Sequence, residues 1–248
     1  MTAVADTTDR AVYVFGVVAS SLLDSDDVQL PDDVDVVRAG PVAAVVGLVG
    51  TERKLGLASD VRRHDRVIAH FVERGITILP MRFGAVVTEP QALVHDVLEP
   101  NRRAFADALR DLDGYVQYTV RVAYVRDAVL AAVMRADPRL AALRDAARAA
   151  GPARDTQVRL GEAVVKAIDR RRDGDAQRLR TELEPLADTL DCELSGDPDR
   201  LGDFTCLVDR EHTDGFETAL EQIAKRHADA VQLTLLGPLA PYHFVPEL

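Results

Sequence analysis

The sequence of 248 residues has no tryptophan, two cysteines and 5% aromatic residues. Cys192 and Cys206 have neither the CxxC spacing nor the neighbouring histidines of a zinc site, and two thiols are too few for a disulfide framework. We therefore expect free thiols in a reducing compartment. The longest nearly apolar run, 41–50, is far shorter than the roughly 18 residues of a membrane-spanning helix, and the acidic N-terminus does not resemble a signal peptide. These absences predict a cytoplasmic protein that does not enter a membrane.

Basic charge is also scarce, because 30 lysines and arginines face 41 acidic residues and give a formal net charge of -11. Nucleic acids and anionic lipids are bound mainly through basic surface, so this balance argues against both as general partners. We interpret the acidity as surface charge that keeps the protein soluble. The hydrophobic content of 47% is typical of a folded protein, and the length favours two small domains.

Motifs of catalysis and cofactor binding are missing as well. The chain has no glycine-rich phosphate loop and no nucleophile elbow, and its histidines are scattered. His64 and His70 lie six residues apart on one expected helix, so they do not share a face as metal ligands at i and i+4 would. Asp24, Asp26 and Asp27 lack the spacing of a calcium loop and are interpreted as turn residues. The sequence thus predicts no catalytic residue, no metal ligand and no cofactor.

Hydrophobic patterns in residues 1–112 predict an N-terminal α+β domain. The expected elements are a central buried strand at 11–19, a hairpin of 34–38 and 42–49, a helix capped by Ser59 with an apolar stripe that includes Val61, a strand at 76–81, and a helix after Thr88 that Pro100 interrupts. This order approximates a ferredoxin-like domain whose first helix is degraded.

Residues 113–248 predict a second α+β domain, a modified ferredoxin-like fold with an inserted helical hairpin. The expected elements are a strand at 115–124 with Gln117, Thr119 and Arg121 on its wet face, helices from Pro138 and from Asp155 with a break near Gly174, a strand at 204–208, a helix from Thr213 and a strand at 231–236. The basic run Arg170–Arg172 lies between acidic residues and indicates a solvated helix face.

The segment Leu79–Gly84, with the sequence LPMRFG, carries one unexplained charge. Arg82 lies between Met81 and Phe83 at the end of a short apolar strand, where a charge must pair or reach solvent. A buried ion pair with a helix carboxylate is the favoured interpretation, and contact with a partner is the alternative.

The segment Gly237–Phe244, with the sequence GPLAPYHF, is the second unusual stretch. Pro238 and Pro241 prevent a regular strand throughout, and Tyr242 and Phe244 are aromatic anchors in an aromatic-poor chain. We expect the two rings to hold the tail on its own C-terminal domain, with a partner contact as the alternative.

These two segments resemble the L-P-x-R-F-G and G-P-x-x-P-Y-x-F motifs of the gas vesicle protein GvpF/GvpL family, and 204–210 resembles its F-x-x-L-V-D segment. The resemblance covers nearly the whole chain. It implies a two-domain α+β protein that is a minor vesicle component and not an enzyme. It further implies binding to the small shell protein GvpA, with other accessory proteins as possible partners, and a role in nucleation and assembly that prevents premature aggregation of GvpA. The implied fold or contact positions are Arg82, Phe83, Pro238, Pro241, Tyr242 and Phe244.

Two other classes of function stay open on the residues alone. One is a small-molecule enzyme whose site is assembled from dispersed histidines and aspartates, which a closed pocket with perturbed groups would favour. The other is a ligand-sensing module built on ferredoxin-like domains. The sequence does not separate GvpF from GvpL.

Overall fold

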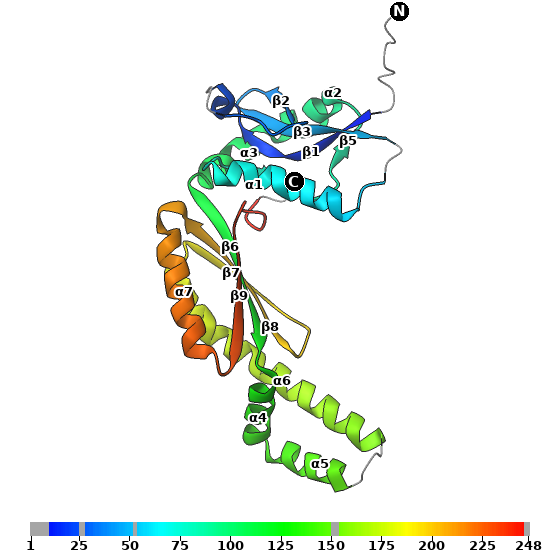
Figure 1. Cartoon of the computed structure of the whole chain (residues 1–248), viewed down its shortest axis with the longest axis vertical. Helices are drawn as coiled ribbons and strands as arrows, with labels where there is room; N and C mark the ends of the chain where they lie inside the picture. Colours follow the sequence, from blue (N-terminus) through cyan, green and yellow to red (C-terminus); the bar gives the residue numbers. More distant parts are fainter. Residues whose placement is uncertain (1–9, 25–27, 52–53, 150–153, 246–248) are drawn as a thin grey trace, which may run out of the picture. The chain divides into compact units, whose positions relative to one another are not determined.

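A computed structural model describes residues 10–24, 28–51, 54–149 and 154–245, so the predicted turn residues Asp26 and Asp27 lie outside it. Contacts group the chain into two compact units, Met1–Gln117 with Pro238–Leu248, and Tyr118–Gly237. Each unit combines helices with one antiparallel sheet, which confirms the α+β class (Figure 1). The tail groups with the first unit, and the division into independent domains at 112/113 stays a prediction.

The first unit contains a sheet with the strand order β2-β3-β1-β4, in which β5 also pairs with β1. Its strands are β1 (Arg10–Ala19), β2 (Asp35–Ala39), β3 (Val42–Gly50), β4 (Leu79–Pro80) and β5 (Val86–Val87). Every residue of β1 from Ala11 to Val18 is buried, as predicted for a central strand with two covered faces. The predicted hairpin is confirmed, because β2 and β3 pair antiparallel across a tight turn.

Helices of the first unit are η2 (Ser20–Asp24, a 3-10 helix), α1 (Ala58–Glu73), α2 (Pro90–Ala92), η3 (Leu93–Leu98, a π-helix) and α3 (Glu99–Asp111). The prediction that Ser59 caps α1 is wrong by two residues. The Asp60 carboxylate, in the first turn, accepts the backbone N–H groups of Gly56 at 3.2 Å and Leu57 at 3.1 Å. Asp60 is the third residue of the helix, so its carboxylate satisfies the N–H groups of the N-cap residue Leu57 and of the residue before it, as the N3 residue of a capping box does.

The interruption expected at Pro100 takes the form of a π-helical stretch. The helical run continues from Pro90 to Asp111, and the π-helix η3 ends two residues before Pro100. Proline lacks an N–H group and clashes with the preceding turn of an α-helix. Wider π turns immediately before it let the run continue, so no break is required.

The second unit contains a sheet with the strand order β7-β8-β6-β9. Its elements are β6 (Tyr115–Tyr124), α4 (Arg126–Ala136), α5 (Pro138–Ala149), α6 (Arg154–Leu183), η4 (Glu184–Leu186), β7 (Thr189–Leu194), β8 (Arg200–Asp209), η5 (Arg210–His212), α7 (Thr213–His227) and β9 (Val231–Leu239). Without the short 3-10 turns this is a β-α-β-β-α-β order with extra helices in the first connection. In the described parts of the chain, no helix is both long and apolar enough to span a bilayer.

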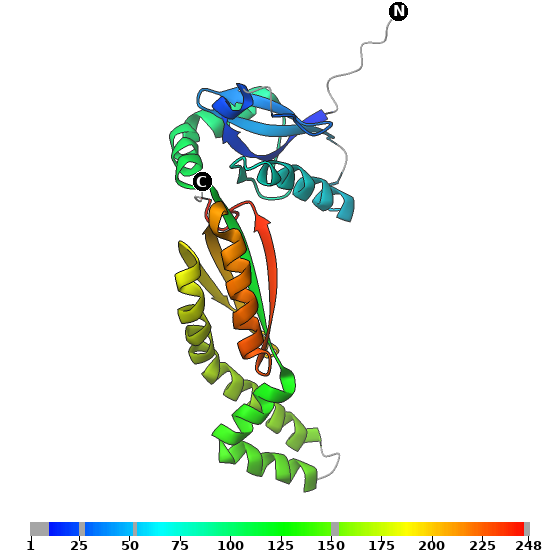
Figure 2. The same cartoon turned by 60° about the vertical axis from the view of Figure 1, so that its left-hand side comes forward.

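Alternate residues of β6 anchor two helices on one face of this sheet. The Tyr118 ring stacks on Phe216 of α7 with centroids 4.9 Å apart, and its hydroxyl donates to Glu217 at 2.7 Å. Further along the same face, the Tyr124 hydroxyl donates to Asp175 of α6 at 2.9 Å. Figure 2 shows α7 lying along the strands. The predicted alternation of β6 is confirmed, except that Gln117 on the other face is buried.

Helix α6 differs from two predictions. It runs for 30 residues without a break at Gly174. Arg172, expected on a solvated face, is 7% exposed, bonds Asp169 at 2.8 Å and donates to the Asp197 carbonyl at 3.0 Å. Ion pairs and packing on both sides of the glycine outweigh its low helix propensity, which costs about 1 kcal/mol.

Strand β7 was not predicted, because its residues adjoin a long helical pattern. It is an edge strand with alternating exposure, and two of its six residues, Asp191 and Glu193, are acidic types that are depleted in strands. Pairing in continuous register with β8, from Thr189↔Leu207 to Leu194↔Gly202, stabilises it in place of local propensity.

The two cysteines are free and differ in burial, which makes their reactivity testable. Burial raises the pKa of the Cys206 thiol to about 12, and burial also raises the pKa of Cys192. Because the thiolate is the reactive form, we expect Cys206 to resist a thiol reagent at pH 8 in the folded protein, while Cys192 reacts slowly. Labelling with a chromogenic disulfide, with and without denaturant, measures this; fast release of two equivalents from folded protein would contradict it.

Candidate functional site

The segment Leu79–Gly84 lies against the central strand β1. Leu79 and Pro80 pair with Val17 and Gly16, and the Met81 N–H donates to the Phe15 carbonyl at 2.9 Å. Gly16 permits this approach, because a Cβ there would lie 2.7 Å from the Leu79 carbonyl oxygen. The backbone then turns back, with the Ala85 N–H donating to the Arg82 carbonyl at 3.2 Å.

Tyr13 of β1 is the centre of a group of rings that includes this turn. Its hydroxyl hydrogen-bonds His64 Nδ1 at 2.9 Å and accepts the Gly84 N–H at 3.1 Å. Gly84 has φ 91°, a conformation that favours glycine. The Tyr13 ring lies 4.8 Å from Phe15 and 6.3 Å from Phe83, between centroids. We call Tyr13, Phe15, His64 and Phe83 the aromatic cluster.

His64 of α1 lies inside the aromatic cluster and is 2% exposed. Burial lowers its pKa, and this outweighs the opposite effects of the Asp65 charge and of the Met81 backbone. The Phe83 ring packs on it edge-on at 5.9 Å. A neutral histidine held in this way fixes the position of Phe83 and is not placed to exchange protons with a substrate in solvent.

The segment Gly237–Phe244 groups with the first unit from Pro238 onward, although its first three residues continue β9. Pro238 is exposed in β9, an edge strand, where the missing N–H is tolerated. After it, Ala240 is 2% exposed, and the His243 N–H donates to the Gln117 side-chain oxygen at 2.8 Å. The Phe244 N–H donates to the Pro241 carbonyl at 3.0 Å, which closes a compact turn. We expected the tail to pack on its own C-terminal domain, and this is wrong, because the tail groups with residues 1–117.

Tyr242 brings this tail to the aromatic cluster. Burial raises the pKa of Tyr242, and the nearby acidic groups of Asp65 and Tyr13 raise it further. The two sequence segments, about 160 residues apart, thus both lie near Tyr13: Gly84 of the first bonds its hydroxyl, and Tyr242 of the second lies within the range of its charge. Part of each segment faces solvent, since Phe83 is 39% and Tyr242 40% exposed.

The side chain of Arg82 corrects another interpretation. It is exposed, and among the described residues no ion pair of Arg82 is found, so it does not form the expected buried pair. The turn between β4 and β5 places it at the surface beside Phe83, where water solvates its charge.

Two apolar residues at the start of α1 are also exposed, the N-cap residue Leu57 and Val61. Leu57 is 62% and Val61 40% exposed, which overturns the prediction that Val61 belongs to the buried stripe of α1. Val67 is buried instead. Leu57 and Val61 are four residues apart, and Val61 precedes His64 by three, so they share one helix face. We call Leu57, Val61, Arg82, Phe83 and Tyr242 the docking face.

The chemistry of the docking face is that of a contact surface. It offers aromatic and aliphatic carbon and one guanidinium group, and the histidine on which Phe83 packs, His64, is buried. Across the residues with defined positions, no group of three or more His, Cys, Asp or Glu side chains is arranged to hold a metal ion. The contributions of Tyr13 and His64 were not foreseen, although a histidine within an apolar helical stripe was a signal of a buried polar contact.

The fold of the whole chain matches two crystal structures. The gas vesicle protein GvpF from Anabaena sp. PCC7120 superposes with a TM-score of 0.77 at 20% identity, covering 96% of this chain and 99% of that one. GvpF from Microcystis aeruginosa gives a TM-score of 0.76 at 20% identity with the same coverage. At this identity the likeness concerns the fold.

Sequence comparisons extend the likeness beyond the fold. Gas vesicle protein F of Streptomyces sp. (strain CB03234) is 31% identical over 217 residues, which are 87% of this chain and 89% of that protein. Gas vesicle protein L1 of Halobacterium salinarum is 23% identical over 229 residues, 86% of this chain and 81% of that protein. The model of the family described as "Gas vesicle synthesis protein GvpL/GvpF" matches residues 11–246. This chain therefore belongs to the GvpL/GvpF family of gas vesicle proteins.

Proposed function

We propose that this protein is a gas vesicle accessory protein that binds the shell protein GvpA through the docking face and assists assembly of the shell. The observation that supports this most is the placement of the two segments in one unit: Phe83 and Tyr242 are about 160 residues apart in the sequence, both are partly exposed, Phe83 packs near Tyr13, and Tyr242 lies within the range of its charge. Exposed aromatic rings held by a rigid base are typical of binding surfaces.

The physical role that we propose is shielding of an apolar subunit. A small hydrophobic shell protein exposes surface that aggregates before it is assembled. The docking face supplies apolar contacts, and the net charge of -11 of the whole chain keeps such a complex soluble. In this proposal the protein acts in the cytoplasm at the growing vesicle, as a binding protein and not as an enzyme.

The docking face can be tested by removing its two rings. We expect the Phe83→Ala/Tyr242→Ala double variant to bind GvpA at least about tenfold more weakly than the wild type, since two anchors of about 1 kcal/mol each are lost. Co-purification of tagged full-length chain with GvpA, followed by quantitative binding, measures this loss.

Leu194→Ala provides the matched control. Leu194 is 40% exposed, like Tyr242, but lies on β7 in the second unit. This variant should bind GvpA as the wild type does. Equal binding by a folded double variant would refute the docking face, and no capture of GvpA by the wild type would refute direct contact.

A further inference from the structure

The second unit contains a cavity of about 390 Å³ that no part of the proposed function uses. It lies where the end of β6 and the start of β9 meet α4 and α6, and this volume is within the range of small-molecule sites. Its apolar lining includes Val129, Leu179, Leu201 and Val231, all at most 7% exposed. A ligand with an apolar part would be desolvated by these side chains.

The polar lining of this cavity has an excess of positive charge, which is unusual in an acidic chain. Three arginines, Arg135, Arg171 and Arg178, face two aspartates, Asp175 and Asp229, so the formal balance is 3 − 2 = +1. His227 also lines the cavity and is hydrogen-bonded to Glu182 at 2.7 Å. Glu182 accepts a second hydrogen bond from Arg226 at 2.6 Å. The excess positive charge of the lining therefore comes from its arginine side chains.

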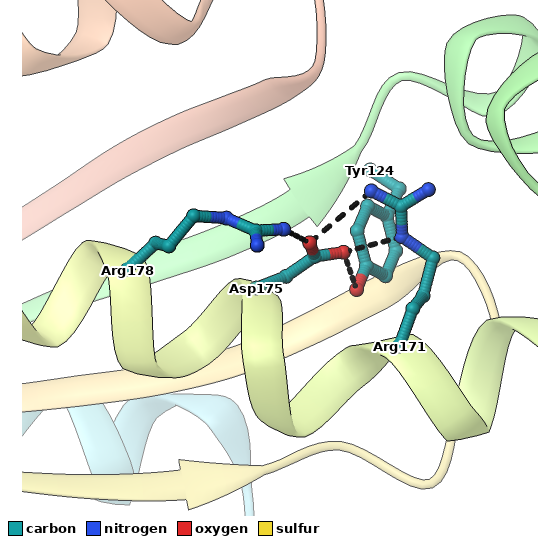
Figure 3. A network of polar contacts seen from close by, with 4 residues as sticks. All are labelled: Tyr124, Arg171, Asp175 and Arg178. Atoms are coloured by element: carbon teal, nitrogen blue, oxygen red, sulfur yellow. Dashed lines mark hydrogen bonds and ion pairs between the residues drawn. The ribbon is translucent and has the colours of Figure 1, made fainter.

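Asp175 is fully engaged by its neighbours and leaves no acceptor for a ligand (Figure 3). Its Oδ2 atom accepts the Tyr124 hydroxyl at 2.9 Å and Arg171 Nε at 2.6 Å. Its Oδ1 atom accepts Arg171 Nη2 at 3.1 Å and is also bonded by Arg178. One carboxylate thus neutralises one of two guanidinium groups, and the second keeps its charge at the cavity.

Arg178 and Arg135 each have guanidinium N–H groups beyond those used in the hydrogen bonds described next. The Arg178 side chain is 68% exposed and reaches Asp175 with a single N–H group. Arg135 is exposed on α4, and its Nε donates to the Ala131 carbonyl at 3.3 Å within its own helix. Guanidinium forks with free donors bind carboxylates in a bidentate manner.

We propose that this cavity binds a small monocarboxylate with a short apolar chain. The carboxylate is held by Arg135 and Arg178, and the chain lies against Val129, Leu179 and Leu201. A single negative charge matches the formal balance of +1, and the apolar lining distinguishes such a ligand from inorganic anions. This site is separate from the docking face, so each proposal can fail without the other.

Hexanoate, hexylammonium and inorganic phosphate are suitable probes for the full-length protein. We expect hexanoate at millimolar concentration to raise the melting temperature and to give saturable heat in titration calorimetry. Hexylammonium, which has the same chain and the opposite charge, should give neither. Phosphate should give at most a tenth of the affinity of hexanoate, because it gains nothing from the apolar lining.

Variants locate the effect in the cavity. Arg135→Ala and Arg178→Ala change exposed side chains and should each lower the affinity for hexanoate at least about fivefold, by loss of a charge-assisted hydrogen bond. Arg139→Ala, an exposed residue of α5, is the control and should bind as the wild type. No saturable hexanoate binding, equal binding of hexylammonium, tighter binding of phosphate, or unchanged affinity in both cavity variants would each overturn the proposal.

Discussion

The Asp175→Ala variant is expected to lose about 3 kcal/mol of unfolding free energy, because it removes the common acceptor of a partly buried network. The change leaves the buried Tyr124 hydroxyl without its bond and leaves Arg171, one third exposed, without its counter-ion. We place the loss at the lower end of values for broken buried pairs, since water still reaches both arginines. Urea unfolding followed by circular dichroism measures it.

The variant Asp175→Asn provides a control, because its difference in unfolding free energy from the wild type should depend on pH. Burial of Asp175 would raise the pKa of its carboxyl, but the bonds from Arg171 and Tyr124 outweigh burial and hold this pKa below the ordinary value of 3.8. A folded-state pKa below the unfolded one adds stability above the unfolded pKa, and this stability is lost as pH falls through the folded pKa. The difference between wild type and Asp175→Asn should therefore be full at pH 6 and shrink below about pH 4. A constant difference from pH 6 to pH 3 would contradict the role of the ionised carboxylate.

Truncation of Phe15 is the second large effect that we expect, with a loss of about 3 to 5 kcal/mol for Phe15→Ala. Phe15 is 1% exposed, packs against Tyr13 and His64, and lies under the Arg63 guanidinium at 5.2 Å. The variant leaves a cavity beneath the aromatic cluster, and these neighbours relax only in part. Thermal and urea unfolding give the loss.

Phe83→Ala is the matched comparison from the same aromatic cluster. Because Phe83 is 39% exposed, we expect its truncation to cost about 1 kcal/mol or less in stability. The two rings thus separate stability from binding: Phe15→Ala destabilises the first unit, while Phe83→Ala weakens partner binding in a folded protein. Similar stability losses for both variants would show that Phe83 is part of the core and would weaken the docking face.

Strands β1 and β6 could be predicted from the sequence because burial decides their residue pattern. The continuous apolar run of β1 matches a strand covered on both faces, and the alternation of β6 matches a sheet with helices on one face. The start of α1 and the π turns before Pro100 were misjudged in detail, because a helix can begin with more than one capping arrangement and can accommodate a proline without a break.

The docking face was predictable only in its parts. The sequence singled out Arg82, Phe83 and Tyr242, but it contained no signal that Tyr13 would join the two segments. That contact depends on Gly84 turning its N–H toward β1 and on Gln117 binding the His243 N–H, and both are long-range pairings. The exposure of Val61 has the same origin. Helical periodicity predicts which apolar residues share a face, but it does not show how far along the helix other elements bury that face.

The return of the chain to its first unit orders the events of biosynthesis. Tyr118–Gly237 is one continuous segment inserted between the two parts of the first unit. On the ribosome, residues 238–245 are made only after the whole insertion, so the hydrogen bond from the His243 N–H to Gln117 can form only then. The inserted unit is free to fold in that interval, and the surface that we assign to GvpA is completed last.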